Sequence, residues 1–213
     1  MQREFLKRSI SSLVLILIII FLIIKGTVFL NLFILLCFLI SLYEWHKMKK
    51  DNIFYVSGII FLLLSFYSVF RLTNYEVDNS YFLLILTICI STDIGGYIFG
   101  KIFKGKKLTK ISPNKTYSGM LGSLILSLIF SSLFLELTTN FTYLSLNSIN
   151  TLIFILLISI ISQTGDIVIS YFKRKSKIKN TGNIIPGHGG LLDRIDGMIF
   201  AFPFGYFFLF LEI

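Results

Sequence analysis

Apolar residues dominate the chain in long runs that short polar segments separate. Runs of roughly 20 residues, with about 17 as a lower limit, can cross the hydrocarbon core of a bilayer as helices. The runs predict transmembrane helices near residues 8–24, 27–46, 53–70, 81–100, 119–138, 148–172 and 194–211. Only Lys25 and Gly26 separate the first two runs, which predicts a tight helical hairpin or, with six spans in all, one long bent helix. We therefore expect an all-α, polytopic integral membrane helix bundle of about seven transmembrane helices.

The distribution of basic residues supports this count, because Lys and Arg gather in the cytoplasmic loops of membrane proteins. If the N-terminus is cytoplasmic, all 20 Lys and Arg residues except Lys25 and Arg71 fall in cytoplasmic segments. A hydrophobic share of 55% and a mean hydropathy of +0.83 also exclude a soluble domain of this length. We expect one membrane domain over residues 1–213, with N-terminal spans in 1–80 and the candidate chemistry in 81–213.

Two of the 11 acidic residues, Asp93 and Asp166, lie well inside predicted spans and away from the span ends, where a charged side chain costs about 2.5–3.5 kcal/mol on insertion scales. Asp93 precedes Lys101 by eight residues, and Asp166 precedes Lys173 by seven. At ~1.5 Å per residue, both carboxylates should lie roughly 10–12 Å below the cytoplasmic ends of their helices. They can therefore share one cavity, although hydrogen bonding between helices is an alternative role for each acid.

The polar residues around these acids recur at helical spacing. On span 148–172 the polar face comprises Ser159, Ser162, Asp166, Ser170 and Lys173. On span 81–100, Asp93, Tyr97 and Lys101 share a face, and nearby glycines allow a second helix to approach closely.

Asp193 and Asp196 are three residues apart at the predicted start of the last span, so they should project from one side of its first turn. Helix capping is an alternative role for an acid at this position. The preceding Pro-Gly-His-Gly-Gly turn, which contains His188, offers N–H groups that could form a nest for an anion.

The net charge of +9 is concentrated partly in two basic loops, 101–118 and 173–194, each next to a span with an intramembrane aspartate. Nucleic acid is a poor partner for basic loops on so apolar a chain, whereas a polyphosphate fits them. Carboxylates without nearby cysteine favour a hard cation such as Mg²⁺ over zinc. Mg²⁺ with cationic side chains indicates phosphoryl chemistry, and the residues alone lead no further than that reaction class.

Four motifs stand out, namely STDIGGY in 91–97, ISPNKTYSG in 111–119, QTGD in 163–166 and the long run from SYFKR in 170–174 to PGHGGLLDRID in 186–196. Together they resemble the signature of the phosphatidate cytidylyltransferase (CDP-diacylglycerol synthase) family. The resemblance implies transfer of a cytidylyl group from CTP to phosphatidate, giving CDP-diacylglycerol and pyrophosphate. This sequence departs from the usual family pattern at Ser118, where the family usually has Glu, and at Asn180, where it usually has Asp.

The resemblance also implies roles for individual residues. Mg²⁺ would be held by Asp166 and Asp193, with Asp196 and Asp93 as further ligands or close neighbours. The implied catalytic residues are Asp166, Asp193, Asp196, Lys173 and Arg174. The implied substrate-binding residues are Lys115, Ser170, Lys179, His188, Gly189, Gly190 and Arg194.

Two other functions stay open at this point. A CTP-dependent lipid-alcohol kinase would need a base for a hydroxyl nucleophile, for which Asp93 is the candidate. An ion or proton transporter would use Asp93 and Asp166 as a relay. For the transferase we expect CTP, phosphatidate in the bilayer and membrane lipids as partners, and no nucleic acid. We expect the protein to lie in a bacterial inner membrane with its active site facing the cytoplasm. A homodimer is possible.

Overall fold

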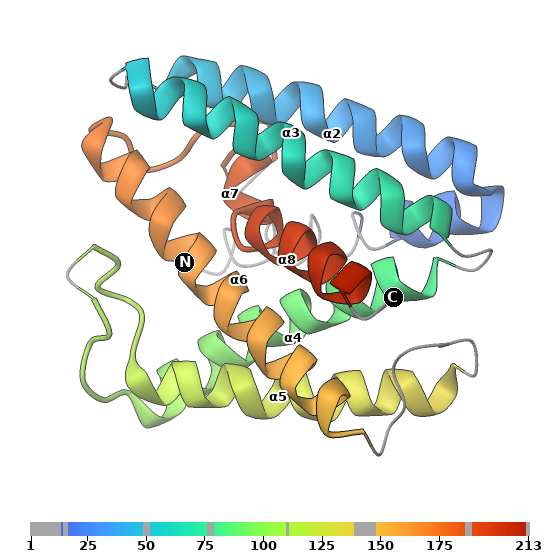
Figure 1. Ribbon diagram of the computed structural model, residues 1–213. Helices are drawn as coiled ribbons and strands as arrows, with labels where there is room; N and C mark the ends of the chain where they lie inside the picture. Colours follow the sequence, from blue (N-terminus) through green and yellow to red (C-terminus); the bar gives the residue numbers. More distant parts are fainter. Residues whose placement is uncertain are drawn as a thin grey trace. The chain divides into compact units, whose positions relative to one another are not determined.

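The computed structural model describes residues 14, 17–48, 52–75, 79–109, 111–138, 148–185 and 189–211. Within these residues the chain forms helices and no strand (Figure 1). The helices are α2 (Thr27–Lys47), α3 (Asn52–Tyr75), α4 (Ser80–Phe103), α5 (Tyr117–Leu137), α6 (Ile149–Lys175), α7 (Leu192–Ile195) and α8 (Met198–Leu211). Residues 17–25, ahead of α2, are also helical. The prediction of an all-α fold is confirmed.

Five helices in the described part of the chain are long and apolar enough to cross a membrane, namely α2, α3, α4, α5 and α6. This confirms a polytopic membrane protein. Most of the first predicted span, 8–24, lies outside the described residues, and the last apolar helix, α8, has only 14 residues. The count of seven spans therefore stays a prediction.

The start of the last predicted span differs from expectation. Residues 194–211 do not form one helix, because α7 ends at Ile195 and α8 begins at Met198. Between them, the backbone N–H of Gly197 donates to Oδ1 of Asp196 at 2.9 Å. Such a local side-chain bond offers the backbone an alternative to the helical ladder. The prediction that Asp193 and Asp196 share the first turn of one helix is therefore wrong.

The helices fall into two compact units, each built from separate stretches of the chain. Unit 1 contains the residues up to Phe70 together with Phe172–Ile195, and unit 2 contains Arg71–Tyr171 together with the residues from Asp196 onward. The expected single domain, with a division near residue 80, stays a prediction.

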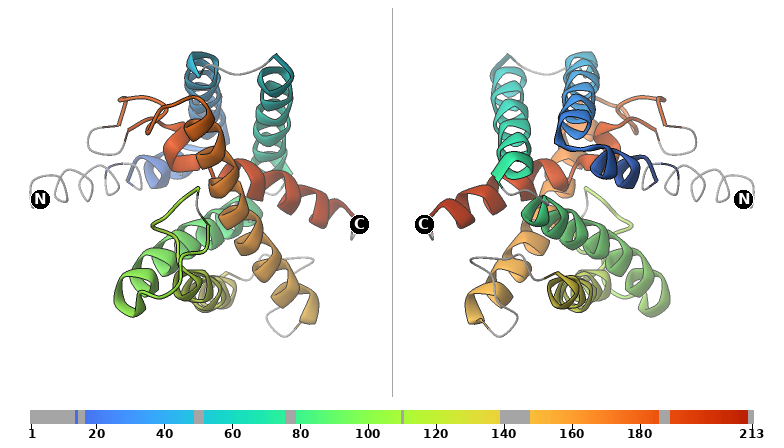
Figure 2. Two further views of the ribbon diagram at one scale, coloured as in Figure 1. Left: turned by 90° about the vertical axis from the view of Figure 1, so that its left-hand side faces the viewer. Right: turned by 90° about the vertical axis from the view of Figure 1, so that its right-hand side faces the viewer.

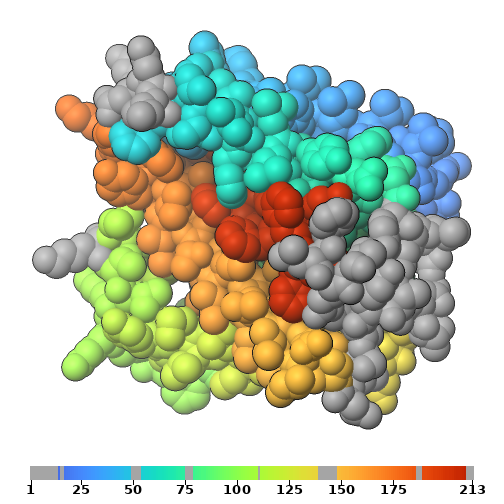
Figure 3. Space-filling view, viewed as in Figure 1, coloured from blue at the N-terminus to red at the C-terminus, as the bar shows by residue number. Residues whose placement is uncertain are grey.

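Aromatic packing at the end of α2 organises unit 1. The indole Nε1–H of Trp45 donates to the backbone carbonyl of Tyr55 at 3.2 Å, and the Trp45 ring meets the Phe172 ring edge-on at 5.5 Å between centroids. Gly58 leaves room for the indole, since a Cβ there would lie 1.9 Å from it. The α2 and α3 side chains of this unit pack against each other in the space-filling view (Figure 3). The last turn of α2 is thereby fixed against α3.

Close contact between α4 and α5 organises unit 2, and both further views show these two helices side by side (Figure 2). A Cβ on Gly95 would lie 2.4 Å from the carbonyl oxygen of Gly122. Ser123 donates to the Thr92 carbonyl at 2.7 Å, and the Thr92 hydroxyl is 2.8 Å from that of Ser159 on α6. The predicted close approach of a second helix at the α4 glycines is confirmed.

Candidate active site

The basic loop before α5 folds back on itself in unit 2. The N–H of Leu108 donates to the Lys115 carbonyl at 2.8 Å, and the N–H of Tyr117 donates to the Lys106 carbonyl at 3.1 Å. Thr116 caps α5, because its hydroxyl accepts the N–H of Gly119 at 3.1 Å. These bonds fix the backbone of Lys115 directly ahead of the helix.

Lys115 reaches the polar face of α6. Its Nζ lies 2.6 Å from Oδ2 of Asp166 and 3.2 Å from the carbonyl oxygen of Gln163. Ser170 donates to the other carboxylate oxygen of Asp166 at 3.2 Å. The side chains of Lys115 and Asp166 are 23% and 30% exposed, so the pair is partly open to a ligand. The structure thus brings together three residues that the sequence assigned to the site.

Gln163 lies on the same helix, three residues before Asp166. Its side-chain Nε2 is buried and has no hydrogen-bond partner in the described part of the chain. An unsatisfied buried amide is uncommon, and a ligand is one way to satisfy it. The sequence reasoning quoted Gln163 in a motif without assigning it a role.

A second lysine–aspartate pair lies in unit 1. Nζ of Lys173 is 2.9 Å from Oδ1 of Asp193, and the two side chains are 10% and 6% exposed. Oδ2 of Asp193 accepts the N–H of Thr181 at 2.8 Å and that of Gly190 at 3.0 Å. One carboxylate therefore holds the end of α6 and both arms of the following loop.

The Gly-rich turn is only partly within the described residues, because 186–188, and with them His188, lie outside. The N–H of Gly189 donates to the Ile185 carbonyl, and that of Gly190 to Asp193. The expectation that this turn exposes its N–H groups is therefore wrong for Gly189 and Gly190. Gly189 has φ +102°, and a Cβ there would lie 2.8 Å from Asp193 Oδ2, so glycine lets the loop close on the carboxylate.

Glu44, which the sequence reasoning passed over, is a second buried acid of unit 1 beside Asp193. It is 1% exposed and accepts hydrogen bonds from Thr181, Leu191 and Leu192. Its position inside the predicted span 27–46 was a usable signal, because an intramembrane acid is a functional candidate by default.

The remaining residues that the sequence assigned to the site are more exposed to solvent. Asp93 is exposed on α4, and Asp196 is half-buried in the turn before α8. Three cations of unit 1 that the sequence assigned to the site are exposed, namely Arg174 near the end of α6, Lys179 on the following loop and Arg194 on α7. Among the described residues, no group of three or more His, Cys, Asp or Glu side chains could hold a metal ion. The shared Mg²⁺ site therefore stays a prediction.

The two positions that depart from the family pattern have local roles. The Ser118 hydroxyl donates to the Lys104 carbonyl and thus helps to close the basic loop of unit 2. Asn180 is exposed and lies against Gly189, where an added Cβ would be 3.1 Å from the Asn180 Cβ.

Five apolar helices of membrane-spanning length, two lysine–aspartate pairs and several exposed cations are typical of a membrane enzyme that acts on phosphate groups. Residues 50–212 match the model of the cytidylyltransferase family. The phosphatidate cytidylyltransferase of Rickettsia typhi is 37% identical over 186 residues, covering 82% of this chain and 80% of the relative. That of Rickettsia bellii is 36% identical over 168 residues (77% and 73%), and that of Bacillus subtilis is 35% identical over 161 residues (73% and 57%). This chain therefore belongs to the phosphatidate cytidylyltransferase family and is a nucleotidyltransferase.

Proposed function

We propose that this protein transfers the cytidylyl group of CTP to phosphatidate in the bilayer, giving CDP-diacylglycerol and pyrophosphate. The observation that carries the proposal is the family match over residues 50–212, which includes both lysine–aspartate pairs. The relatives named phosphatidate cytidylyltransferase support the same substrates for this chain.

The reaction joins two anions, so it depends on charge neutralisation and positioning. A phosphate-monoester oxygen of the lipid attacks the α-phosphorus of CTP, and a new P–O–P linkage forms. The bond from the α-phosphorus to the bridging oxygen breaks, and its electron pair leaves with pyrophosphate. The attacking phosphate is mostly ionised near neutral pH, its second pKa being about 6, so no general base is required.

The described cations have two environments. Lys115 and Lys173 are each held by an aspartate, which fixes their ammonium groups before substrate binds. Arg174, Lys179 and Arg194 are exposed, so a phosphate group in solution can reach them. We assign Lys115 and the three exposed cations to the phosphates of CTP and the lipid, and Lys173 to the support of Asp193.

The carboxylates suit Mg²⁺, since it prefers oxygen ligands. The Asp166 side chain is 30% exposed, and a carboxylate with about four lone-pair sites can accept a cation besides Lys115 and Ser170. We assign the ion to Asp166 and Asp193, with Asp196 and Asp93 as further ligands or close neighbours. Bound there, Mg²⁺ would neutralise charge on the phosphates.

The location follows from the substrates. We place the protein in the bacterial inner membrane, with its active site toward the cytoplasm where CTP is dissolved and with the acyl chains of phosphatidate between helices. The excess of Lys and Arg in the predicted cytoplasmic loops supports this orientation. A homodimer stays an expectation.

Two labelled forms of CTP test the reaction. Purified protein with phosphatidate should move label from the α-phosphate of CTP into lipid and release the β- and γ-phosphates as pyrophosphate. Label from the γ-phosphate appearing in lipid would instead identify a lipid kinase. Ion flux in proteoliposomes without CTP would identify a transporter.

Removing divalent cations tests the metal assignment. EDTA should abolish transfer, and Mg²⁺ should restore it. Asp166→Asn should raise the Mg²⁺ concentration required for half-maximal rate by at least roughly 10- to 100-fold, because even the loss of a group that only supports a metal ligand weakens metal binding by about that factor. An Asp166→Asn enzyme with the wild-type Mg²⁺ requirement would remove Asp166 from the metal site.

A further inference from the structure

Glu44 on α2 is a buried carboxylate that one loop surrounds. Its Oε1 accepts the backbone N–H of Leu191 at 3.0 Å. Its Oε2 accepts the N–H of Leu192 and the hydroxyl of Thr181, both at 2.8 Å. The residue is 1% exposed. Every hydrogen bond that the described structure gives this side chain therefore comes from the segment that ends at Asp193.

Burying a carboxylate this completely costs desolvation free energy, and hydrogen bonds from neutral donors offset that cost here. The described part of the chain gives Glu44 no ion pair, so its carboxylate relies on N–H and O–H groups. Hydrogen bonds to a charged group are stronger than those between neutral groups. The carboxylate is thus a strong anchor for whichever backbone groups it binds.

Glu44 and Asp193 hold the same two stretches of backbone from different sides. Thr181 donates its N–H to Asp193 and its hydroxyl to Glu44. Gly190 donates its N–H to Asp193, and the next two N–H groups along the chain go to Glu44. Moving Glu44 would therefore move the groups that hold Asp193.

Two glycines pack directly against the Glu44 side chain. A Cβ on Gly190 would lie 2.1 Å from Thr181 Oγ1 and 2.4 Å from Glu44 Oε2. A Cβ on Gly182 would lie 2.7 Å from Glu44 Oε1. The two glycines bring the arms of the loop directly against the carboxylate, and Trp45, the next residue of α2, is fixed against α3.

We propose that Glu44 is a positioning residue for the transfer reaction. It fixes Thr181 and residues 190–192, and thereby keeps Asp193 and its partner Lys173 in the position that binding of the nucleotide phosphates requires. Glu44 touches no substrate and acts through the loop. This inference rests on the function proposed above.

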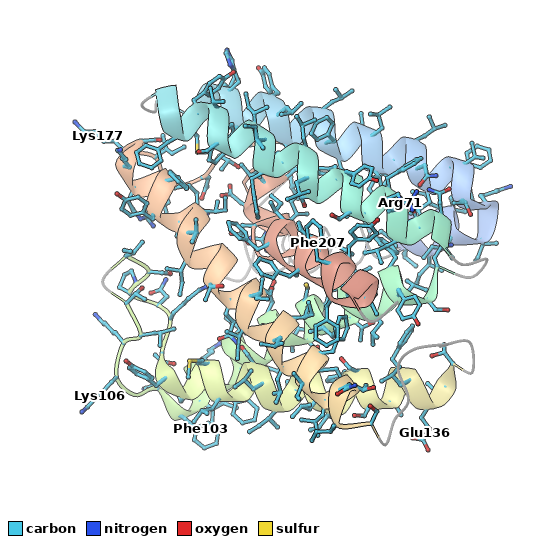
Figure 4. The ribbon with its side chains drawn as sticks, in the orientation of Figure 1. Arg71, Phe103, Lys106, Glu136, Lys177 and Phe207 are labelled. Atoms are coloured by element: carbon cyan, nitrogen blue, oxygen red, sulfur yellow. The ribbon has the colours of Figure 1, made fainter. Side chains whose placement is uncertain are left out.

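Glu44→Gln is the first test, because it keeps the shape of the side chain. An amide cannot accept on both ends, so its NH₂ group would face donors of the loop. We expect kcat/KM for CTP to fall about tenfold or more per folded protein, with KM for phosphatidate little changed. The matched control is Glu136→Gln, because Glu136 is exposed at the end of α5 in unit 2 (Figure 4).

Hydrogen–deuterium exchange gives a readout that needs no turnover. The amides of Leu191 and Leu192 should lose protection in Glu44→Gln and keep it in Glu136→Gln. If Glu44→Gln loses this protection but the wild-type protein transfers no cytidylyl group, the anchoring role of Glu44 is supported and the proposed function is overturned. Unchanged protection in Glu44→Gln would overturn the anchor.

Thr181 provides a milder variant should Glu44→Gln fail to fold. Thr181→Val removes the hydroxyl but keeps the side-chain shape and the N–H bond to Asp193, whereas Thr181→Ser keeps the hydroxyl. We expect Thr181→Val to lower kcat/KM for CTP and Thr181→Ser to restore most of it. Glu44→Asp, which retains two acceptor oxygens, should recover part of the loss in Glu44→Gln.

A purely structural role makes a different prediction. It would lower the yield or Tm of Glu44→Gln and Thr181→Val while leaving kcat and KM per folded protein at wild-type values. That result would overturn the proposal. So would losses that add fully in the Glu44→Gln, Thr181→Val double variant, since residues that act through one hydrogen bond should show coupling.

Discussion

Lys115 is the cation of the site whose environment the structure defines most closely. Lys115→Met should reduce the transfer rate by roughly 100-fold, because Met fills similar space without the charge that neutralises developing negative charge. Lys106→Met is the matched control, since Lys106 lies on the same loop and its side chain points away from the helices (Figure 4). The rate of CDP-diacylglycerol formation measures both. Equal losses in the two variants would mean that the loop acts only through its total charge.

The unsatisfied amide of Gln163 leads to a prediction in which stability and activity separate. Gln163→Leu removes a buried donor that has no partner among the described residues, so the Tm should stay equal or rise. If substrate oxygen pairs with this amide, KM for one of the substrates should rise by about tenfold in the same variant. Thermal unfolding and steady-state kinetics on one preparation provide both numbers. A fall in Tm with unchanged KM would show that Gln163 serves the fold alone.

Several of these residue-level features were predictable from sequence. Helical spacing placed Asp166 and Ser170 on one polar face, and the hydrogen bond between them confirms that alignment. The pairing of Lys115 with Asp166 was not predictable, because their separation of more than 50 residues is closed by a loop whose path depends on backbone bonds. Glu44 was missed because it lies only two residues from the end of predicted span 27–46 and because its partners lie more than 130 residues further along the chain.

At the level of elements, the α4–α5 contact depends on glycine. Gly95→Val should lower stability by about 1–3 kcal/mol, because the added methyl groups would meet the backbone of Gly122 and Ser123. Ile94→Val is the control, since Ile94 is the next residue of α4 and is 44% exposed. The Tm in detergent measures the difference. A Gly95→Val protein as stable as the control would show that the helices can separate without cost.

Helix positions followed well from the apolar runs, and helix ends did not. Predicted spans 81–100 and 148–172 correspond to α4 and α6, which extend three residues further at their C-terminal ends. An apolar run ends at the first charged residues, but the helix continues as long as its backbone carbonyls accept hydrogen bonds from backbone N–H groups further along the chain. The break between α7 and α8 was missed because the bond from Gly197 to Asp196 is local and leaves no periodic signal.

At the level of the whole molecule, the basic loops predict which side of the membrane each segment faces. With Cys37 and Cys89 replaced, new cysteines at Lys106 and Lys177 should react with a membrane-impermeant thiol reagent only from the cytoplasm. A cysteine at Glu136 should react only from outside, because α5 separates Glu136 from Lys106 (Figure 4). Labelling in intact cells and in inverted vesicles distinguishes the two sides. Lys106 and Lys177 labelled from opposite sides would contradict the predicted topology.

The side on which the N-terminus lies then decides between seven spans and six. If Lys106 is cytoplasmic, α4, α3 and α2 cross in turn, and Thr27 at the start of α2 faces outward. An additional span over 8–24 returns the N-terminus to the cytoplasm, where Arg3, Lys7 and Arg8 satisfy the positive-inside rule. A single bent helix would instead leave these three cations outside. We expect a protease site fused to the N-terminus to resist external protease in intact cells and to be cut in inverted vesicles; cleavage in intact cells would establish six spans.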